Sequence, residues 1–476
     1  MSAKSRTIWT FIVTSVALFM AQLDNLVVTT ALPVIRGDLH ASLSELEWTV
    51  NAYTLTFAVL LLTGAALGER FGRRRMLVAG LVVFTAGSAA AALAPTVQWL
   101  IVFRALQGAG AAVVTPLTLT LLSAAVPVER RGMALGIWGA VAGLAIATGP
   151  VVGGAVVQGW SWQTIFWLNV PLGLALIPLA RLRVDESRGL ATRLDLPGVG
   201  LASAGLFGIV LGVVRANELG WTSAYVLTAL ALGAALVAAF VVWENRAPQP
   251  MLPMRLFASR GFTATNIASV LMFFGMFGSI FLLAQFLQTV QHYSPLEAGL
   301  RTLPWTGMPI IVSPIAGALA DRVGGKRVVL TGLLLQATGL AWLAAISSPT
   351  VAYSALLPAF IVSGAGMAMF FAPVATMVLG SVRRDEEGIA SGATNALREL
   401  GGVFGVAVLA SVFAAHGGYA SGTAFVDGLR PAVAVGAAGV FLAALALLAV
   451  PRRRSAAEVD EAATSAYPVA PEVVPA

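Results

Sequence analysis

The sequence predicts an all-α polytopic membrane protein in which two six-helix bundles are joined through two additional helices, giving fourteen transmembrane helices. Three observations support this prediction: the composition, a regular series of apolar segments, and an internal repeat. Of the 476 residues, 58% are hydrophobic and 11% are charged. A soluble domain is about 45–50% apolar and about 25% charged. A soluble enzyme is therefore excluded, because so few ionic groups could not cover the surface of a chain of this length.

The polar residues exclude further classes of function. The net charge of +7 indicates membrane topology rather than nucleic-acid binding. The chain has no cysteine, and His40, His292 and His416 are too far apart in sequence for a metal-ligand motif. A phosphate-binding Gly-x-x-x-x-Gly-Lys-Ser/Thr loop is also absent from the sequence, which argues against ATP-driven export. We expect no cofactor, no metal and no enzyme activity.

A helix needs about 20 mainly apolar residues to cross a bilayer, and the chain contains fourteen candidate segments. In order, they are 8–29, 48–67, 76–94, 99–123, 133–158, 165–180, 198–214, 225–243, 265–288, 299–319, 328–346, 353–379, 396–415 and 432–450. The first contains Asp24 and lacks a small-residue cleavage site, so it is predicted to be a retained helix rather than a signal peptide. Pro304, Pro309 and Pro314 predict a bend in the tenth segment.

The positive charges fix the predicted orientation. With the N-terminus inside, 23 of the 29 lysines and arginines lie in cytoplasmic segments and four lie outside; the four are Arg36, Arg215, Arg301 and Arg430. Because cytoplasmic loops carry an excess of Lys and Arg, both termini are predicted to be cytoplasmic and the protein to span the cell membrane. The tail, residues 455–476, is rich in Ala, Pro and Glu and is predicted to be disordered.

Two parts of the chain repeat each other. Residues 65–75, Ala-Ala-Leu-Gly-Glu-Arg-Phe-Gly-Arg-Arg-Arg, match residues 317–327, Gly-Ala-Leu-Ala-Asp-Arg-Val-Gly-Gly-Lys-Arg, at an offset of 252. A Gly-Ala-Gly sequence at residue 108 recurs at residue 364, at an offset of 256. The matching segments are eight helices apart, so two helices are inserted between two six-helix halves. The predicted domains are residues 1–185, the two additional helices in 186–258, and residues 259–454. Such parallel repeats are typical of transporters with a site near the membrane midplane.

Four motifs in this order resemble the fourteen-helix drug:proton antiporter family of the major facilitator superfamily. They are residues 23–33, Leu-Asp-Asn-Leu-Val-Val-Thr-Thr-Ala-Leu-Pro; residues 65–75; Arg104 with Gln107-Gly-Ala-Gly; and residues 139–154, which end in Gly-Pro-Val-Val-Gly-Gly. Ala65 and Glu69 depart from the usual Gly and Asp of that family. The resemblance covers nearly the whole chain and implies the major facilitator fold and proton-coupled export of amphipathic drugs or antibiotics. The expected partners are a small amphipathic substrate, protons and the lipid bilayer, and we expect a monomer.

Asp24 is the one carboxylate deep inside a clearly apolar segment, where an ionised side chain costs about 2.5–3.5 kcal/mol. One interpretation is a group that binds either a proton or a cationic substrate, with Asn25 adding hydrogen bonds; the other is a structural acid paired with an arginine. The resemblance implies the first. It also implies a part in proton transfer for Arg104.

Because a guanidinium stays protonated at ordinary pH, we assign Arg104 to tuning a carboxyl pKa and to helix contacts. The alternative is that the Arg104 side chain snorkels to the outer membrane surface and has no role in coupling. Glu399 is the second candidate coupling carboxylate. With Arg398 it is predicted at the cytoplasmic start of the thirteenth segment.

Two further groups of residues are candidates. Glu69, Arg70 and Arg73, with Asp321 and Arg322 in the second copy, are predicted to form a cytoplasmic gate; the resemblance implies an ionic latch that stabilises an outward-open state. The alternative is positive charge that only fixes topology. Gly149, Pro150, Gly153 and Gly154 resemble the antiporter motif of the fifth helix and are predicted to form a hinge, although close helix packing would also explain these glycines.

Two other functions stay open at the level of sequence. The first is export of an endogenous metabolite, such as a self-made antibiotic, a siderophore or a lipid. The second is a membrane protein that does not transport, such as an intramembrane enzyme or a sensor. The sequence contains no catalytic dyad or metal cluster that favours an enzyme.

Overall fold

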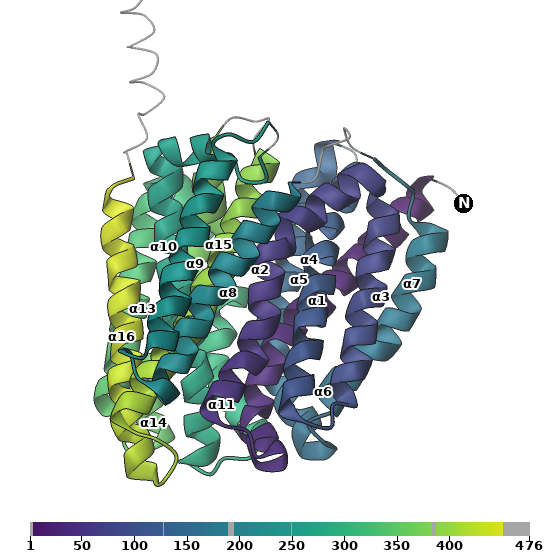
Figure 1. The fold of residues 1–476 in the computed structure, drawn as a ribbon. Helices are drawn as coiled ribbons and strands as arrows, with labels where there is room; N and C mark the ends of the chain where they lie inside the picture. Colours follow the sequence, from purple (N-terminus) through teal and green to yellow (C-terminus); the bar gives the residue numbers. More distant parts are fainter. Residues whose placement is uncertain (1–2, 127, 189–194, 249, 383–386, 451–476) are drawn as a thin grey trace, which may run out of the picture.

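The computed structural model describes residues 3–126, 128–188, 195–248, 250–382 and 387–450, and within these ranges every regular element is a helix (Figure 1). Thirteen stretches of helix among the described residues are long and apolar enough to cross a membrane. One further helix, α5 (Val128–Gly159), has 32 residues and matches the predicted fifth segment. Together they account for the fourteen predicted segments.

The elements divide into three groups along the chain. The first group is α1 (Ala3–Leu39), α2 (Leu43–Phe71), α3 (Arg73–Ala92), α4 (Val97–Ala125), α5, and the short α6 (Thr164–Trp167) followed by α7 (Asn169–Arg183). The second is α8 (Leu196–Leu219) and α9 (Ala224–Glu244). The third is η1 (Met254–Ala258), α10 (Arg260–Thr289), α11 (Pro295–Thr306), α12 (Met308–Val323), α13 (Gly325–Ile346), α14 (Tyr353–Leu379), α15 (Glu387–His416) and α16 (Gly422–Leu448).

The N-terminal half, α1–α7, lies at the right of Figure 1 and the C-terminal half, α10–α16, at the left. The N-terminus and the end of α16 lie on the same face of the bundle, here called the terminal face; the other end is called the opposite face. The predicted tail at 455–476 lies outside the described residues, as do the arginines at 193, 383–384 and 452–454. The prediction of a disordered tail therefore stays a prediction.

Several helices differ from their predicted segments. The tenth segment consists of α11 and α12, which are separated at Gly307. Pro309 follows directly; it has no backbone N–H and its ring clashes with the carbonyl four residues earlier, so a continuous helix is broken here, as the prolines predicted. Other helices are longer than predicted. α15 begins at Glu387, nine residues before the predicted start at 396. α16 begins at Gly422, ten residues before the predicted 432, and α1 ends at Leu39, ten residues after the predicted 29.

The internal repeat is visible in the helix ends. Ser42 and Glu45 form a capping box at the start of α2, and Ser294 and Glu297 form the same capping box at the start of α11, 252 residues later. Gly72 ends α2 with a φ of +105° and Gly324 ends α12 with a φ of +93°. This positive φ is open to glycine at little cost, so both copies of the repeat end their helix in the same way.

The two halves meet closely where α5 crosses α11, near the opposite face. A Cβ at Gly154 would lie 2.2 Å from the carbonyl oxygen of Pro295, and a Cβ at Gly299 would lie 2.3 Å from that of Pro150. No larger residue fits at either position without separating the helices, so the glycines of the two halves pack reciprocally against each other's backbone.

A second contact between the halves joins α2 to α15, and the two additional helices cover it (Figure 1). One buried apolar cluster contains residues from all four helices; its members include Leu55 and Val59 of α2, Val210 of α8, Phe240 of α9, and Val403 and Ala407 of α15. The inserted pair therefore packs against the boundary between the halves rather than forming a separate unit. Most of α9 is exposed and apolar, as expected for a lipid-facing helix.

Candidate functional site

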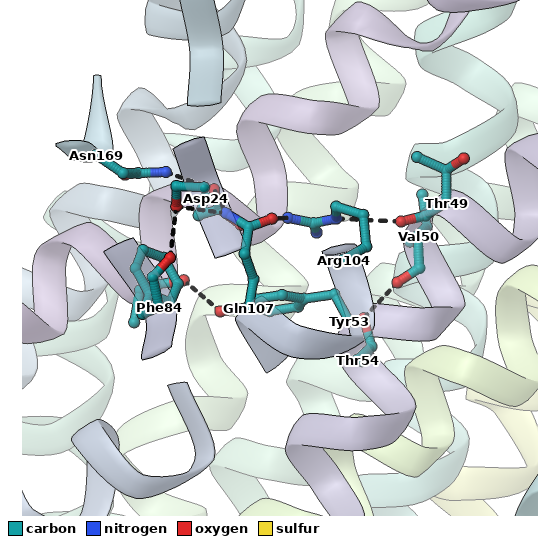
Figure 2. A network of polar contacts seen from close by, with 11 residues as sticks. Asp24, Thr49, Val50, Tyr53, Thr54, Phe84, Arg104, Gln107 and Asn169 are labelled. Carbon is teal, nitrogen blue, oxygen red and sulfur yellow. Dashed lines mark hydrogen bonds and ion pairs between the residues drawn. The ribbon is translucent and has the colours of Figure 1, made fainter. Parts of the chain in front are cut away.

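Asp24 and Arg104 form a buried ion pair between α1 and α4 (Figure 2). The Arg104 side chain is completely buried, and 2% of the Asp24 side chain is exposed. Nη1 of Arg104 donates to Oδ2 of Asp24 and, at 3.0 Å, to Oε1 of Gln107. The predicted alternative of a snorkelling Arg104 is therefore wrong, because the guanidinium points into the bundle toward the carboxylate.

The second oxygen of Asp24 accepts hydrogen bonds from two amides. Nδ2 of Asn169, at the start of α7, lies 2.7 Å from Oδ1, and Nε2 of Gln107 lies 3.2 Å from it. Gln107 also donates to Ser88 of α3 at 2.7 Å. The carboxylate thus joins α1, α3, α4 and α7 in one network (Figure 2). Both oxygens of this buried carboxylate therefore have hydrogen-bond donors.

The opposite side of Arg104 contacts α2. Its Nε donates to the carbonyl of Thr49 at 3.2 Å, and the guanidinium carbon lies 4.3 Å from the centroid of the Tyr53 ring. The Tyr53 hydroxyl donates to the carbonyl of Ala21 in α1 at 2.9 Å. Arg104 is therefore held between a carboxylate and an aromatic ring, and its Nη2 group makes no hydrogen bond with a described residue.

The other coupling candidates lie in different surroundings. Asn25 is buried, but its Oδ1 has no partner in the described part of the chain, and it does not join the Asp24 network. Glu399 is buried in α15 and its Oε2 is also without a partner there. Glu399 lies within electrostatic range of Tyr53, as Asp24 and Arg104 do, so this carboxyl of the C-terminal half lies near the network of the N-terminal half.

The predicted position of Arg398 and Glu399 at a helix start needs correction. Since α15 begins at Glu387, Arg398 is eleven residues into the helix, which is about 16 Å along its axis. Its guanidinium lies 5.8 Å from the Phe273 ring and 5.7 Å from the Phe370 ring. The sequence-based boundary was set too late, and both charges belong to the interior of the bundle.

The predicted gate residues of the first copy form an ionic cluster at the terminal face. Arg73 pairs with Glu69 at 2.6 Å, one turn away. Glu186, which follows α7, accepts hydrogen bonds from the backbone N–H groups of Arg74 at 3.0 Å and Arg75 at 3.3 Å, at the start of α3. Arg70 is outside this cluster and lies over the Phe71 ring.

In the second copy, Asp321 and Arg322 are exposed and make no ion pair with another described residue. Lys326 donates instead to the carbonyl of Leu448 at the end of α16, at 2.8 Å. The two predicted gate segments are therefore not joined to each other by an ion pair within the described ranges.

The predicted hinge residues pack against both halves. A Cβ at Gly149 would lie 2.8 Å from Leu26 of α1, and one at Gly153 would lie 2.3 Å from the Thr30 hydroxyl. Pro150 and Gly154 contact α11, as described above. This part of α5 is wedged between α1 of its own half and α11 of the other half, which is where a change in the angle between the halves would act.

The comparisons with known proteins decide the family. The family model of the major facilitator superfamily matches residues 14–199, 188–406 and 265–473. The chain belongs to the major facilitator superfamily. It is 36% identical over 408 residues to "Multidrug resistance protein Stp" of Mycobacterium tuberculosis, covering 85% of this chain and 76% of that protein. It is 34% identical to the "Tetracenomycin C resistance and export protein" of Streptomyces glaucescens, covering 86% and 76%.

Solved structures support the same superfamily fold. A bacterial homologue of the human lysosomal transporter Spinster, described as inward-facing and unoccupied, superposes with a TM-score of 0.67 at 16% identity. The match covers 94% of this chain and 98% of that one. At this identity the likeness shows the fold alone. This likeness confirms the major facilitator fold that the four sequence motifs predicted.

Several residues of this superfamily member contribute to the site although their roles were not predicted. They are Tyr53, Ser88, Gln107, Asn169 and Glu186. The first four are polar side chains that are buried within apolar helices, which is a signal of function or of interhelical bonding in a membrane protein. For Glu186 no such signal exists, because its contact with α3 joins positions more than 100 residues apart.

Within the C-terminal half, α10 and α14 contribute a group of aromatic side chains. Phe273 and Phe277 of α10 stack with centroids 5.7 Å apart, and Phe371 of α14 meets Phe273 edge-on at 6.1 Å. Phe273 and Phe277 are 7% and 9% exposed, so they lie at the edge of the core rather than in the lipid.

Proposed function

We propose that this protein is a proton-coupled antiporter that exports amphipathic drugs or antibiotics across the cytoplasmic membrane by alternating access. The observation that carries the proposal is the buried Asp24–Arg104 pair with its amide partners. We further propose that residues 1–185 and 259–454 act as two domains of one monomer that rock about a midplane cavity, with residues 186–258 packed along their boundary.

Protonation of Asp24 is the proposed coupling step. Ionised Asp24 balances the charge of Arg104 and accepts bonds from Gln107 and Asn169. A proton removes that charge and leaves Arg104 as a buried cation without a counterion, which is unfavourable by several kcal/mol. The contacts among α1, α4 and α7 then rearrange, and this free energy biases the equilibrium between the two orientations of the halves. Glu399, with its unpaired Oε2, is the proposed second proton site.

The energetics allow such coupling. One proton that enters down a gradient of one pH unit releases about 1.4 kcal/mol, and a membrane potential of 100 mV adds about 2.3 kcal/mol. Each 1.36 kcal/mol is a factor of ten, so one proton supports a gradient of roughly a few hundredfold for a neutral substrate.

The proposed orientation places the terminal face in the cytoplasm, because the predicted loops on that side carry 23 of the 29 Lys and Arg. The Glu69–Arg73 cluster then belongs to a cytoplasmic gate and the α5–α11 crossing to the outer side. The described contacts hold the outer side closed. Closure of the cytoplasmic gate would bring the first-copy cluster toward the C-terminal half.

The proposed substrate class rests on the relatives and on the buried aromatic side chains of α10 and α14. Stacked rings such as Phe273 and Phe277 suit planar, apolar molecules. One relative is named for multidrug resistance, and the other for resistance to tetracenomycin C and its export. Export of an endogenous antibiotic is the second candidate, favoured by the relative named for tetracenomycin C. Comparing the drug susceptibility of a deletion strain with its secreted metabolites separates the two.

The test uses the full chain in proteoliposomes with an imposed pH gradient. Asp24→Asn removes the titratable group but keeps its size, so we expect proton-driven efflux of dyes or antibiotics to be lost while the protein still inserts. Asp185→Asn is the matched control, because Asp185 pairs with Arg6 but is exposed. Full gradient-driven transport by Asp24→Asn would disprove Asp24 as the coupling group. Transport that persists after an uncoupler is added would disprove proton coupling itself.

A further inference from the structure

The two halves also touch at the opposite face, away from the α5–α11 crossing, through Arg36 and Tyr419. Arg36 lies in the last turn of α1, and Tyr419 lies in the segment between α15 and α16. The guanidinium carbon of Arg36 is 3.4 Å from the centroid of the Tyr419 ring. The Tyr419 hydroxyl donates to Oε1 of Gln285 in α10 at 2.5 Å. A cation of the N-terminal half is therefore stacked on a ring of the C-terminal half.

The Tyr419 ring is held in a fixed position. It meets the rings of Phe413 and Phe425 edge-on, with centroids 5.4 Å away in both cases. Burial raises the pKa of the Tyr419 phenol, Arg36 lowers it and Glu47 raises it further, so both charged groups lie within range of the ring. Because the phenol stays neutral and the ring cannot turn freely, Tyr419 presents a constant face to Arg36.

A second contact between the two halves, from α10 to α1, supports closure near this level. Nε2 of Gln288 in α10 donates to the carbonyl of Thr30 in α1 at 2.9 Å. Thr30 precedes Arg36 by less than two turns, and Gln288 follows Gln285 by less than one. The end of α1 is therefore joined to the C-terminal half by a hydrogen bond from α10 and by the stacking of Arg36 on Tyr419.

Open space adjoins this contact. A hollow of about 440 Å³ is lined by residues of both halves, among them Arg36, His40, Gln285 and Tyr419. At the α5–α11 crossing, in contrast, backbone meets backbone and only glycine fits. The Arg36 side chain has room to move away from the ring without displacing packed core residues. The contact is therefore suited to breaking and forming repeatedly.

We propose that Arg36 and Tyr419 form an outer latch, a pair of positioning residues whose stacking holds the opposite face closed and whose separation accompanies its opening during transport. The latch rests on the alternating access of the proposed function. It does not depend on which group carries the proton.

The experiment measures the opening directly. The chain has no cysteine, so Thr96→Cys and Thr350→Cys introduce two spin-label sites in exposed loops of the opposite face, one in each half. Pulsed electron–electron distance measurements on the full chain in lipid nanodiscs give the ratio of open to closed states. We expect Arg36→Gln and Tyr419→Leu each to raise this ratio roughly 2- to 30-fold, which corresponds to a cation–π contact of about 0.5–2 kcal/mol.

Matched variants separate stacking from other roles. Tyr419→Phe keeps the ring and loses the hydroxyl bond to Gln285, so it is expected to shift the ratio less than Tyr419→Leu. Arg36→Lys keeps a cation and is expected to restore part of the closed population lost in Arg36→Gln. The double variant Arg36→Gln/Tyr419→Leu is expected to open the face no further than the larger single effect, because both remove the same contact.

Unchanged distances in both single variants, or additive effects in the double variant, would overturn the latch. If Tyr419→Leu does not fold, Arg36→Gln decides alone, because Arg36 is only half-buried at a helix end. The distances are measured without substrate or a pH gradient. A failure of proton coupling at Asp24 would therefore leave this result intact, and a failure of the latch would leave the coupling test intact.

Discussion

The two halves of this transporter place different chemistry at equivalent positions of the repeat. At the offset of 256, Arg104 corresponds to Phe360, and at the offset of 252, Tyr53 corresponds to Trp305. In the N-terminal half, Arg104 lies 4.3 Å over the Tyr53 ring. In the C-terminal half, Phe360 stacks on Trp305 with centroids 6.1 Å apart. The same contact between helices is built once around a cation and once around two aromatic rings.

The hydrogen-bond partners of Arg104 also differ between the two copies of the repeat. At the 256-residue offset, which the repeat shows for α4, Gln107 corresponds to Ser363. Ser363 is buried and its hydroxyl has no partner among the described residues, so these positions of α14 carry neither the guanidinium nor its amide partner. The fold therefore does not need a buried charge at this level. Since such a charge is costly in a membrane, its presence at this position in only one copy of the repeat supports a functional role for it.

The largest expected effect comes from leaving the buried carboxylate without its cation. Arg104→Gln is expected to lower the free energy of unfolding by about 3–5 kcal/mol, because ionised Asp24 would stay buried without a counterion. The double variant Asp24→Asn/Arg104→Gln is expected to recover part of this loss. Denaturant titration in detergent micelles of the two single variants and the double variant measures the coupling. Additive losses would show that the pair is not the unit that stabilises this half.

The sequence predicted some residues of this site and missed others. Asp24 was identified because a carboxylate within an apolar segment is rare, and Arg104 because its motif resembles that of the family; the structure brings the two together. Gln107 and Asn169 were not assigned, because neutral amides give a weak signal and their partners lie on other helices. Arg398 and Glu399 were placed at a helix start because charge normally marks a membrane boundary. Tertiary packing overrides that pattern: α15 continues toward the terminal face, where Gly392 lies against Leu62 of α2.

A smaller effect is expected from the aromatic counterpart of Arg104. Phe360→Leu keeps an apolar side chain but removes the stacking on Trp305, which contributes about 0.5–1.5 kcal/mol. We expect a loss of stability of this size and an unchanged dependence of transport on the pH gradient, because no titratable group is touched. The measurements are denaturant titration and transport rates at several imposed gradients. A changed pH dependence would mean that the coupling chemistry extends into the C-terminal half at this level.

The smallest expected effect separates the two copies of the predicted gate. Glu69 pairs with Arg73 at the terminal face, whereas Asp321 is exposed and makes no ion pair with a described residue. Both members of the first pair are 20–25% exposed, so Glu69→Gln is expected to cost no more than about 1 kcal/mol, and Asp321→Asn to have no measurable effect on stability. Salt should weaken the first effect, because it screens partly exposed charges. If Glu69→Gln nevertheless abolishes transport while Asp321→Asn does not, the first-copy cluster acts in the transport cycle and the second copy does not. Equal losses of transport in both variants would mean that Asp321 forms an ion pair in the other conformation of the transport cycle. The difference between the two copies would then be a property of the conformation described here only.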